Sequence, residues 1–181
     1  MWRVYRAGGP HPTTWNGFRS YGPIATARFD HHEPPPHLDP DRSILYASSD
    51  IQGALAETYQ DTRLIDRVDG EPWLVAFELA LDVVALDLTG AWPTRAGASQ
   101  AIASGRRNVA RAWSRLIWEE YRDIDGIWYP SSMAGGTHSL AAFESGQSKV
   151  PRNPALNLPL SHPGLLADLN RIAARFAYSL R

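Results

Sequence analysis

The chain has 181 residues, and about 70% of the surface of an unfolded chain of this size can be buried on folding, which suits one core better than two. It contains no cysteine, so disulfide frameworks, thiolate zinc sites, iron–sulfur clusters and a cysteine nucleophile are excluded. The formal net charge is −1 and 20% of the residues are charged, which is an ordinary globular composition with no global demand for a polyanion such as nucleic acid.

No apolar stretch is long enough to span a bilayer, and the first residues are not followed by the apolar run of a signal peptide. We therefore expect a single cytoplasmic domain over residues 1–181, without contact to a membrane and without direct nucleic-acid binding.

A short strand is expected at the N-terminus, where Trp2 and Val4 alternate with Arg3 and Tyr5. The segment Gly8–Pro40 is then rich in proline and glycine, which exclude a regular helix or a central strand. A loop of this length inside a compact domain is usually functional or disordered, and its aromatic residues favour order. We expect it to lie over the surface.

Three further strands and one helix are expected in the middle of the chain. Ser43–Ala47 is typical of a short buried strand, and Ser48-Ser49-Asp50 supplies capping side chains for a helix over Ile51–Gln60. The alternating and β-branched segments Trp73–Leu79 and Val83–Leu88 predict strands.

The second half of the chain predicts a helix over Ala101–Tyr121, interrupted near Ser104-Gly105, and a last amphipathic helix over Ser161–Ser179. Between them, Ile127–Tyr129 predicts a strand that Pro130 ends, and Leu140–Phe143 predicts the last strand. This order of elements favours an α+β fold, with a mixed, mainly antiparallel sheet flanked by helices, over a doubly wound sheet.

The segment around His31, His32, Glu33 and His37 contains good ligands for zinc or iron. The intervening Pro34–Pro36 holds the chain extended, so the outer histidines would point apart along roughly 18 Å of chain. We therefore expect no metal site and interpret the segment as a solvated loop.

Four arginines in the predicted helix, Arg106, Arg107, Arg111 and Arg115, could contact phosphates, but such a run is more often a solvated helix face, and we interpret it so. The sequence lacks three common motifs: the dinucleotide-binding glycine motif, the phosphate-binding loop of nucleoside triphosphatases and the nucleophile elbow of serine hydrolases.

Three polar residues lie where packing alone would not place them. Arg28 lies inside the long loop, Glu57 lies at the border of the apolar face of its helix beside small neighbours, and Ser131 follows a strand that Pro130 ends. Ends of strands are common places for sites. Taken singly, each residue is equally consistent with a structural role.

Several blocks of sequence extend this observation, and they run in order through the chain: Trp2-Arg3-Val4, Ala27–Asp30, Ile44–Ser48, Ala54–Glu57, Val84–Thr89, Asp125–Ser131 and Leu140–Glu144. Together, over residues 2–145, they resemble the RES domain, a family named after an arginine, a glutamate and a serine that match Arg28, Glu57 and Ser131. The last helix lies outside the resemblance.

The resemblance implies a fold like that of ADP-ribosyltransferase toxins, and a reaction in which the nicotinamide–ribose bond of NAD is cleaved and ADP-ribose passes to phosphate, water or a protein. It implies that NAD is the substrate, that no metal is needed, and that the chain is the toxin of a pair whose partner is an Xre-type helix-turn-helix antitoxin. Family members often carry an asparagine motif before the last strand, where this chain has His138 and Ser139. The oligomeric state stays open, a homodimer included.

For individual residues, the resemblance implies that Arg28 clamps the pyrophosphate, Glu57 stabilises the ribosyl cation and Ser131 orients Glu57 or the ribose. Tyr46 would stack on nicotinamide, and Arg3 is a weaker candidate for a second phosphate contact.

Two other functions stay open. One is a non-catalytic dinucleotide- or partner-binding module of the same fold. The other is a small carbohydrate- or RNA-binding domain, suggested by seven tryptophans and seven tyrosines, although core packing explains those rings better.

Overall fold

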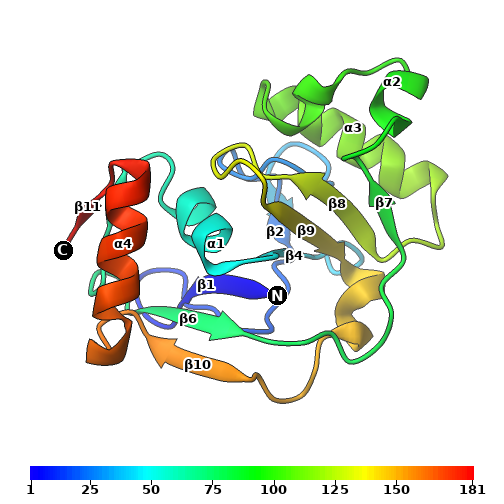
Figure 1. The fold of residues 1–181 in the computed structure, drawn as a ribbon. Coiled ribbons are helices and arrows are strands. Elements are labelled where there is room, and N and C mark those ends of the chain that lie inside the picture. Colours follow the sequence, from blue (N-terminus) through cyan, green and yellow to red (C-terminus); the bar gives the residue numbers. More distant parts are fainter.

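The computed structural model describes all 181 residues and has a seven-stranded sheet at its centre, in the order β10-β6-β1-β4-β9-β8-β7 (Figure 1). Within this sheet only β7 and β8 run parallel. The expected α+β class with a mixed, mainly antiparallel sheet is confirmed. The strands are β1 (Trp2–Arg6), β4 (Ile44–Ser48), β6 (Pro72–Ala76), β7 (Ala85–Asp87), β8 (Gly126–Pro130), β9 (His138–Phe143) and β10 (Leu156–Pro159).

Three longer helices flank this sheet, and short elements fill the connections (Figure 1). The α-helices are α1 (Ile51–Thr58), α2 (Trp92–Arg95), α3 (Arg107–Glu120) and α4 (Leu166–Phe176), and the 3-10 helices are η1 (Gln100–Ala103), η2 (Glu144–Lys149) and η3 (Pro163–Leu165). Two small strand pairs join β2 (Tyr21–Gly22) to β3 (His37–Leu38), and β5 (Leu64–Ile65) to β11 (Ser179–Leu180).

Alternation along the strands divides the core between the two faces of the sheet. On one face, Ile44 of β4 packs with Ile117 of α3, and farther along the same face Leu74 of β6 packs with Leu55 of α1 and Leu169 of α4. The opposite face has its own cluster, which the long N-terminal loop covers. The face that carries the helices therefore has two separate apolar clusters with a gap between them.

The sheet also opens beside this gap. β1 pairs with β6 over five residues, but it pairs with β4 at one position only, Trp2 opposite Ser48. Arg3 alternates with Trp2 and belongs to the opposite face, but the opening between β1 and β4 exposes it to the gap. The gap and the opening together form a cavity.

The predicted elements lie within a few residues of the observed ones. The helix expected over residues 101–121 is interrupted as predicted, into η1 and α3, and the last helix begins as η3 and continues as α4. The strand β10 was not predicted, because its four residues end in Pro159 and occupy the edge of the sheet, where local patterning is weak.

The long loop departs in part from its expected solvated character. Phe29, Asp30, His31 and His32 are fully buried. His32 Nδ1 lies 2.6 Å from Asp30 Oδ1, and His31 Nε2 lies 3.1 Å from Glu144 Oε2. Burial next to Phe29 is possible because most of these polar groups have hydrogen-bond partners, although His31 Nδ1 has none. Residues 29–32 are therefore a buried anchor, whereas residues 34–38 are exposed, as the sequence predicted.

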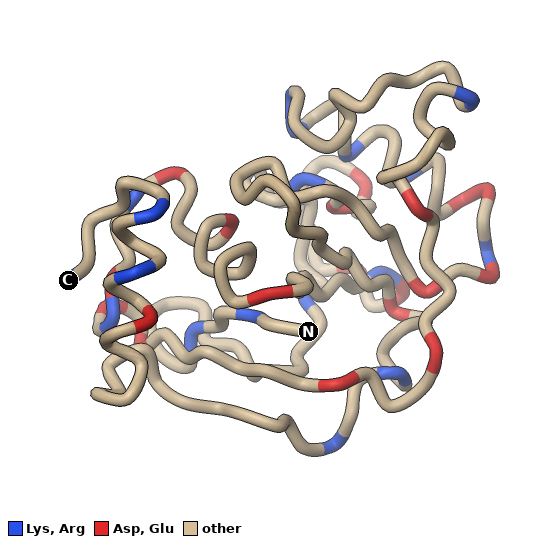
Figure 2. The backbone as a smooth tube through the Cα atoms, viewed as in Figure 1, with Lys and Arg blue, Asp and Glu red and all other residues tan.

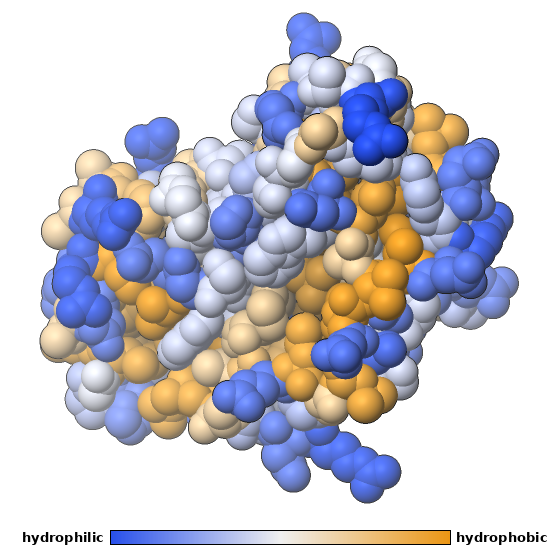
Figure 3. Space-filling view, turned by 45° about the vertical axis from the view of Figure 1, so that its right-hand side comes forward, coloured by the Kyte–Doolittle hydropathy of each residue, from blue (hydrophilic) through white to orange (hydrophobic).

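Charged positions are not segregated by sign along the backbone. Basic and acidic positions are interspersed over the backbone (Figure 2). Apolar side chains gather on the face shown in Figure 3, and a shallow, mainly apolar hollow lies between Met1, Trp128 and the segment 79–85. No helix combines the length and the apolar character that a membrane span requires.

Candidate active site

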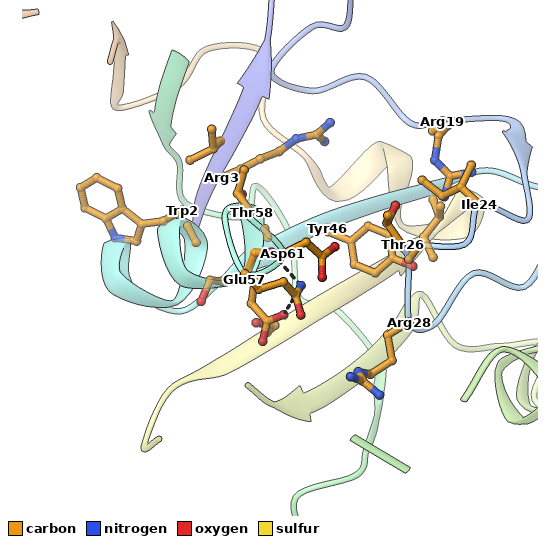
Figure 4. Close-up of a pocket in the computed structure, with 18 of the residues that line it drawn as sticks. Trp2, Arg3, Arg19, Ile24, Thr26, Arg28, Tyr46, Glu57, Thr58 and Asp61 are labelled. Carbon is orange, nitrogen blue, oxygen red and sulfur yellow. Dashed lines mark hydrogen bonds between the residues drawn. The ribbon is translucent and has the colours of Figure 1, made fainter. Parts of the chain in front are cut away.

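A cavity of about 600 Å³ occupies the gap between the two apolar clusters. Its floor comes from β1, β4, β8 and β9, and its walls come from α1, the first residue of α3 and the loop segment 24–28. Arg3, Arg28, Tyr46 and Glu57 all line it (Figure 4). Residues that are far apart in sequence thus meet around one space.

Glu57 reaches the cavity because of how α1 begins and packs. The side chain of Asp50 caps the helix by accepting a 2.7 Å hydrogen bond from the backbone N of Gly53. A Cβ at Gly53 would overlap the hydroxyl of Ser48 and lie 2.9 Å from that of Thr137, so any other residue here would force these side chains to move. Ala54 and Ala56 are buried on either side, which leaves Glu57 at the cavity wall.

The turn after β8 holds the carboxylate of Glu57. Ser131 Oγ donates a 2.6 Å hydrogen bond to Glu57 Oε1, and the backbone N of Ser132 donates a second one of 3.0 Å to the same oxygen. Ser131 Oγ also accepts hydrogen bonds from the backbone N of Met133 and Ala134, at 3.2 and 3.0 Å. Ser131 does not line the cavity itself; it contacts the site through Glu57.

Arg28 projects from the long loop and donates a 2.6 Å hydrogen bond from Nη1 to the carbonyl oxygen of Gly105. Its pKa is lowered, chiefly by burial, while the charge of Glu57 acts in the opposite direction and that of Arg107 adds to the lowering. The guanidinium has no carboxylate within ion-pair distance. It is therefore free to bind an anion that enters the cavity.

Tyr46 presents part of its ring to the cavity, while its hydroxyl is buried and forms no hydrogen bond. Burial raises the pKa of this phenol, so it stays protonated and can donate. Ser139 Oγ, also in the cavity lining, is likewise buried without a partner. Unpaired buried polar atoms are costly, so these two hydroxyls, which lie below the accessible surface of the cavity, are a local cost to the fold.

Arg3 lines the cavity from β1 and donates one hydrogen bond of 3.2 Å, to the carbonyl oxygen of Gly17. Burial lowers its pKa to about 10, the phenol of Tyr5 opposes this, and the charge of Arg19 adds to it. Arg19 is paired with Asp30 at 2.8 Å, whereas Arg3 has no acidic partner. A partly buried guanidinium without a counter-charge favours an anionic ligand.

The arginine run in α3 is not the solvated face that the sequence predicted. Arg111 Nη1 contacts carbonyl oxygens of the loop segment 24–27, and Arg115 Nε lies 3.5 Å from Glu33. Arg107 lines the cavity, and only Arg106 is exposed without a partner. These side chains connect α3 to the loop, which a helical pattern alone does not reveal.

Sequence reasoning also missed Asp61 and Ser139, which line the cavity. Asp61 lies in no motif, and Ser139 stands where this chain departs from the family's asparagine motif. The positions of both residues in the cavity depend on contacts between distant elements. For Arg107 a signal existed in the arginine run, but helix periodicity does not show which arginine faces a cavity.

No group of three or more histidines, aspartates and glutamates is arranged to hold a metal ion. The cavity combines one oriented carboxylate with several arginines and a tyrosine ring. This arrangement can bind an anionic ligand and place a negative charge beside a part of it that becomes positive.

A comparison with protein families finds that the model described as RES domain matches residues 1–161 of the chain. No curated protein and no solved structure matches it.

Proposed function

The chain belongs to the RES domain family, and on that premise we propose that it binds NAD in the cavity and cleaves the nicotinamide–ribose bond. The observation that carries the proposal is the Glu57 carboxylate, which Ser131 and Ser132 fix in a cavity that also contains unpaired arginines.

Cleavage of the nicotinamide–ribose bond requires little acid or base catalysis. The bond between ribose C1′ and the nicotinamide nitrogen breaks, and its electron pair leaves with nicotinamide, which is cationic in NAD and becomes neutral. Positive charge then develops on the ribose, as in glycoside cleavage. A carboxylate held beside the ribose, such as Glu57, stabilises this charge and needs no rearrangement at the moment of reaction.

Other residues of the cavity would bind NAD. The fork of Arg28 matches the geometry of phosphate oxygens and would hold the pyrophosphate. Arg3 would supply a second contact to phosphate, and the exposed part of the Tyr46 ring would stack on nicotinamide.

The ribosyl cation would pass to an oxygen of phosphate, water or a protein, with loss of a proton from the acceptor where it carries one. In the cell, such a reaction would make the chain a toxin that depletes NAD or modifies a target. Its partner would be an antitoxin of the Xre helix-turn-helix type that neutralises it.

The test is incubation of the purified protein with NAD, with and without inorganic phosphate, followed by mass spectrometry of the products. We expect free nicotinamide together with ADP-ribose, its 1-phosphate or a modified protein. Glu57→Gln keeps the shape of the side chain but loses its charge, so we expect its kcat to fall about 100- to 1,000-fold.

Arg28→Ala should weaken NAD binding first, because the pyrophosphate is charged in the ground state and in the transition state alike. Wild-type protein that binds NAD but releases no nicotinamide would instead indicate a non-catalytic dinucleotide-binding module. Nicotinamide release by Glu57→Gln at the wild-type rate would remove the carboxylate from the mechanism.

A further inference from the structure

An ion pair joins two walls of the cavity. Arg107, the first residue of α3, places Nη2 3.1 Å from Oδ1 of Asp61, which lies in the turn that follows α1. Both residues line the cavity. The side chain of Arg107 is 27% exposed and that of Asp61 is 58% exposed, so the pair lies where the cavity meets solvent.

This ion pair is poorly explained as a structural contact. Exposed ion pairs contribute little to stability, because solvent screens them and both side chains lose freedom. A cation in the first turn of a helix is also unfavourable to the helix, whose N-terminal end is itself positive. α3 has no acidic residue in this turn to compensate for Arg107.

Arg107 also lies close enough to Arg28 for its charge to lower the pKa of Arg28, after the larger effects of burial and of Glu57. Two guanidinium groups close to each other repel unless an anion lies between them. Of the two, Arg107 has a carboxylate partner and Arg28 has none.

We propose that Arg107 binds the pyrophosphate of the substrate together with Arg28, and that Asp61 is an internal anion that occupies Arg107 until the pyrophosphate displaces it. The inference rests on the proposed function, because it takes NAD as the ligand. A phosphate group presents more acceptor oxygens to a guanidinium than one carboxylate oxygen does, so the exchange is favourable. The exposed position of Asp61 lets its side chain swing into solvent at little cost.

The test measures the Kd of ADP-ribose by calorimetry, because this probe contains the pyrophosphate but not the bond to be cleaved. Asp61→Asn should lower the Kd about 2- to 5-fold, since the competing ion pair is lost. Arg107→Ala should raise it about 10-fold or more, the usual effect of losing a charged hydrogen bond. The KM for NAD should follow the Kd, while kcat changes little.

Two variants serve as matched controls. Arg106→Ala removes the same charge from the neighbouring residue, which is exposed and does not line the cavity. Asp168→Asn removes an acid that pairs with Arg171 at 2.6 Å on α4, away from the cavity. Both should leave the Kd within about twofold of the wild-type value.

The double variant Asp61→Asn/Arg107→Ala separates the two ways in which Asp61 could act. If Asp61 acts through Arg107, Asp61→Asn has no further effect once Arg107 is absent. An equal tightening in both backgrounds would mean that Asp61 repels the ligand directly, and this would overturn the inference.

The inference and the proposed function fail differently. A wild-type protein that binds ADP-ribose and releases nicotinamide, but whose affinity is unchanged or weakened by Asp61→Asn, overturns the inference alone. Absence of both binding and nicotinamide release in the wild-type protein overturns the proposed function and the inference with it.

Discussion

At the scale of single residues, Ser131 holds the carboxylate of Glu57 in its orientation, and the effect of this serine on kcat can be measured with a single variant. The 2.6 Å hydrogen bond from Ser131 Oγ is the shortest of three to Glu57 Oε1; the backbone N and the Oγ of Ser132 donate the other two, at 3.0 and 3.4 Å. Two backbone N–H groups in turn fix the position of the hydroxyl. The carboxylate is therefore oriented by a side chain that is itself held in place.

We expect Ser131→Ala to lower kcat for nicotinamide release about 10-fold, because the shortest charge-assisted hydrogen bond is lost while the two bonds from Ser132 remain. The Kd of ADP-ribose should stay within about twofold. Ser131→Thr should restore most of the rate, since it keeps the hydroxyl. As a control, Ser145→Ala removes a hydroxyl that bonds to Ile124 outside the site. Equal losses in Ser131→Ala and Ser145→Ala would contradict the positioning role.

At the scale of elements, the loop that carries Arg28 depends on α3 for its position. The Nη1 group of Arg111 lies within hydrogen-bond distance of three loop carbonyl oxygens, those of Ile24, Ala25 and Ala27, at 3.4, 3.1 and 3.2 Å. Ser114 Oγ donates a further bond of 2.9 Å to the carbonyl oxygen of Phe29. The loop thus has no regular structure of its own here, yet its backbone is held on both sides of Arg28.

We expect Arg111→Ala to raise the KM for NAD about 5- to 10-fold, because the segment that presents Arg28 loses bonds from a charged donor. The unfolding free energy should fall by about 1–3 kcal/mol in denaturant titrations. Arg115→Ala is the matched control: it releases the loop at Glu33, outside the cavity lining. A similar rise in KM for both variants would argue against a specific effect on Arg28.

Periodicity predicts the elements well where one face of an element is buried. The strand at Ile44–Ser48 and the helix that starts after Asp50 follow from alternation and capping. The break at Ser104-Gly105 follows from the low helix propensity of serine and glycine. These features depend on interactions within a few residues of sequence, so the sequence displays them directly.

The rest depends on contacts that no local pattern contains. His31 and His32 look solvated in sequence because histidine and its proline neighbours are polar or irregular, but Glu144 and Asp30 make their burial possible. Likewise Glu57 and Ser131 could be singled out through family resemblance, whereas Asp61 joins the cavity only through the arrangement of α1 and α3.

At the scale of the whole molecule, one buried polar cluster joins the long loop, the sheet and α3. Asp30 accepts hydrogen bonds from Arg19 and from the backbone of Ile24, both at 2.8 Å. Glu144, directly after β9, accepts a 2.5 Å bond from Trp118 of α3 and contacts His31 of the loop. Protonation of either carboxylate would weaken contacts that connect all three parts.

The charge states of this cluster predict acid sensitivity. Burial alone would raise the pKa of Asp30 and of Glu144, but hydrogen bonds from His32 to Asp30, and from His31 and Trp118 to Glu144, lower both to about 2. In an unfolded chain the two groups titrate near 4. Because the folded values are lower, both groups stabilise the fold above about pH 4, and this stabilisation is lost as pH falls toward 2.

His31 also makes the folded protein less stable as the pH falls, but it does so at a higher pH than the two carboxylates. Burial lowers its pKa below the ordinary value of about 6.5, although the hydrogen bond and the charge of Glu144 oppose the shift. The unfolded chain therefore binds a proton on this histidine before the folded protein does. Stability should begin to decline as pH falls below about 6.5, before the steeper decline caused by the two carboxylates.

We therefore expect the unfolding free energy, from urea titrations at successive pH values, to decline gently below about pH 6.5 and steeply below about pH 4. Each carboxylate contributes a slope of up to about 1.4 kcal/mol per pH unit in the steep range.

Glu144→Gln should lower the unfolding free energy at neutral pH and remove one carboxylate's share of the acid slope. Glu119→Gln, at an exposed glutamate of α3 without an ion pair, loses the same charge and is the control. If the two variants showed the same acid slope, the cluster would not control acid unfolding. Because the cluster anchors the loop that carries Arg28, ADP-ribose affinity should weaken over the same acid range.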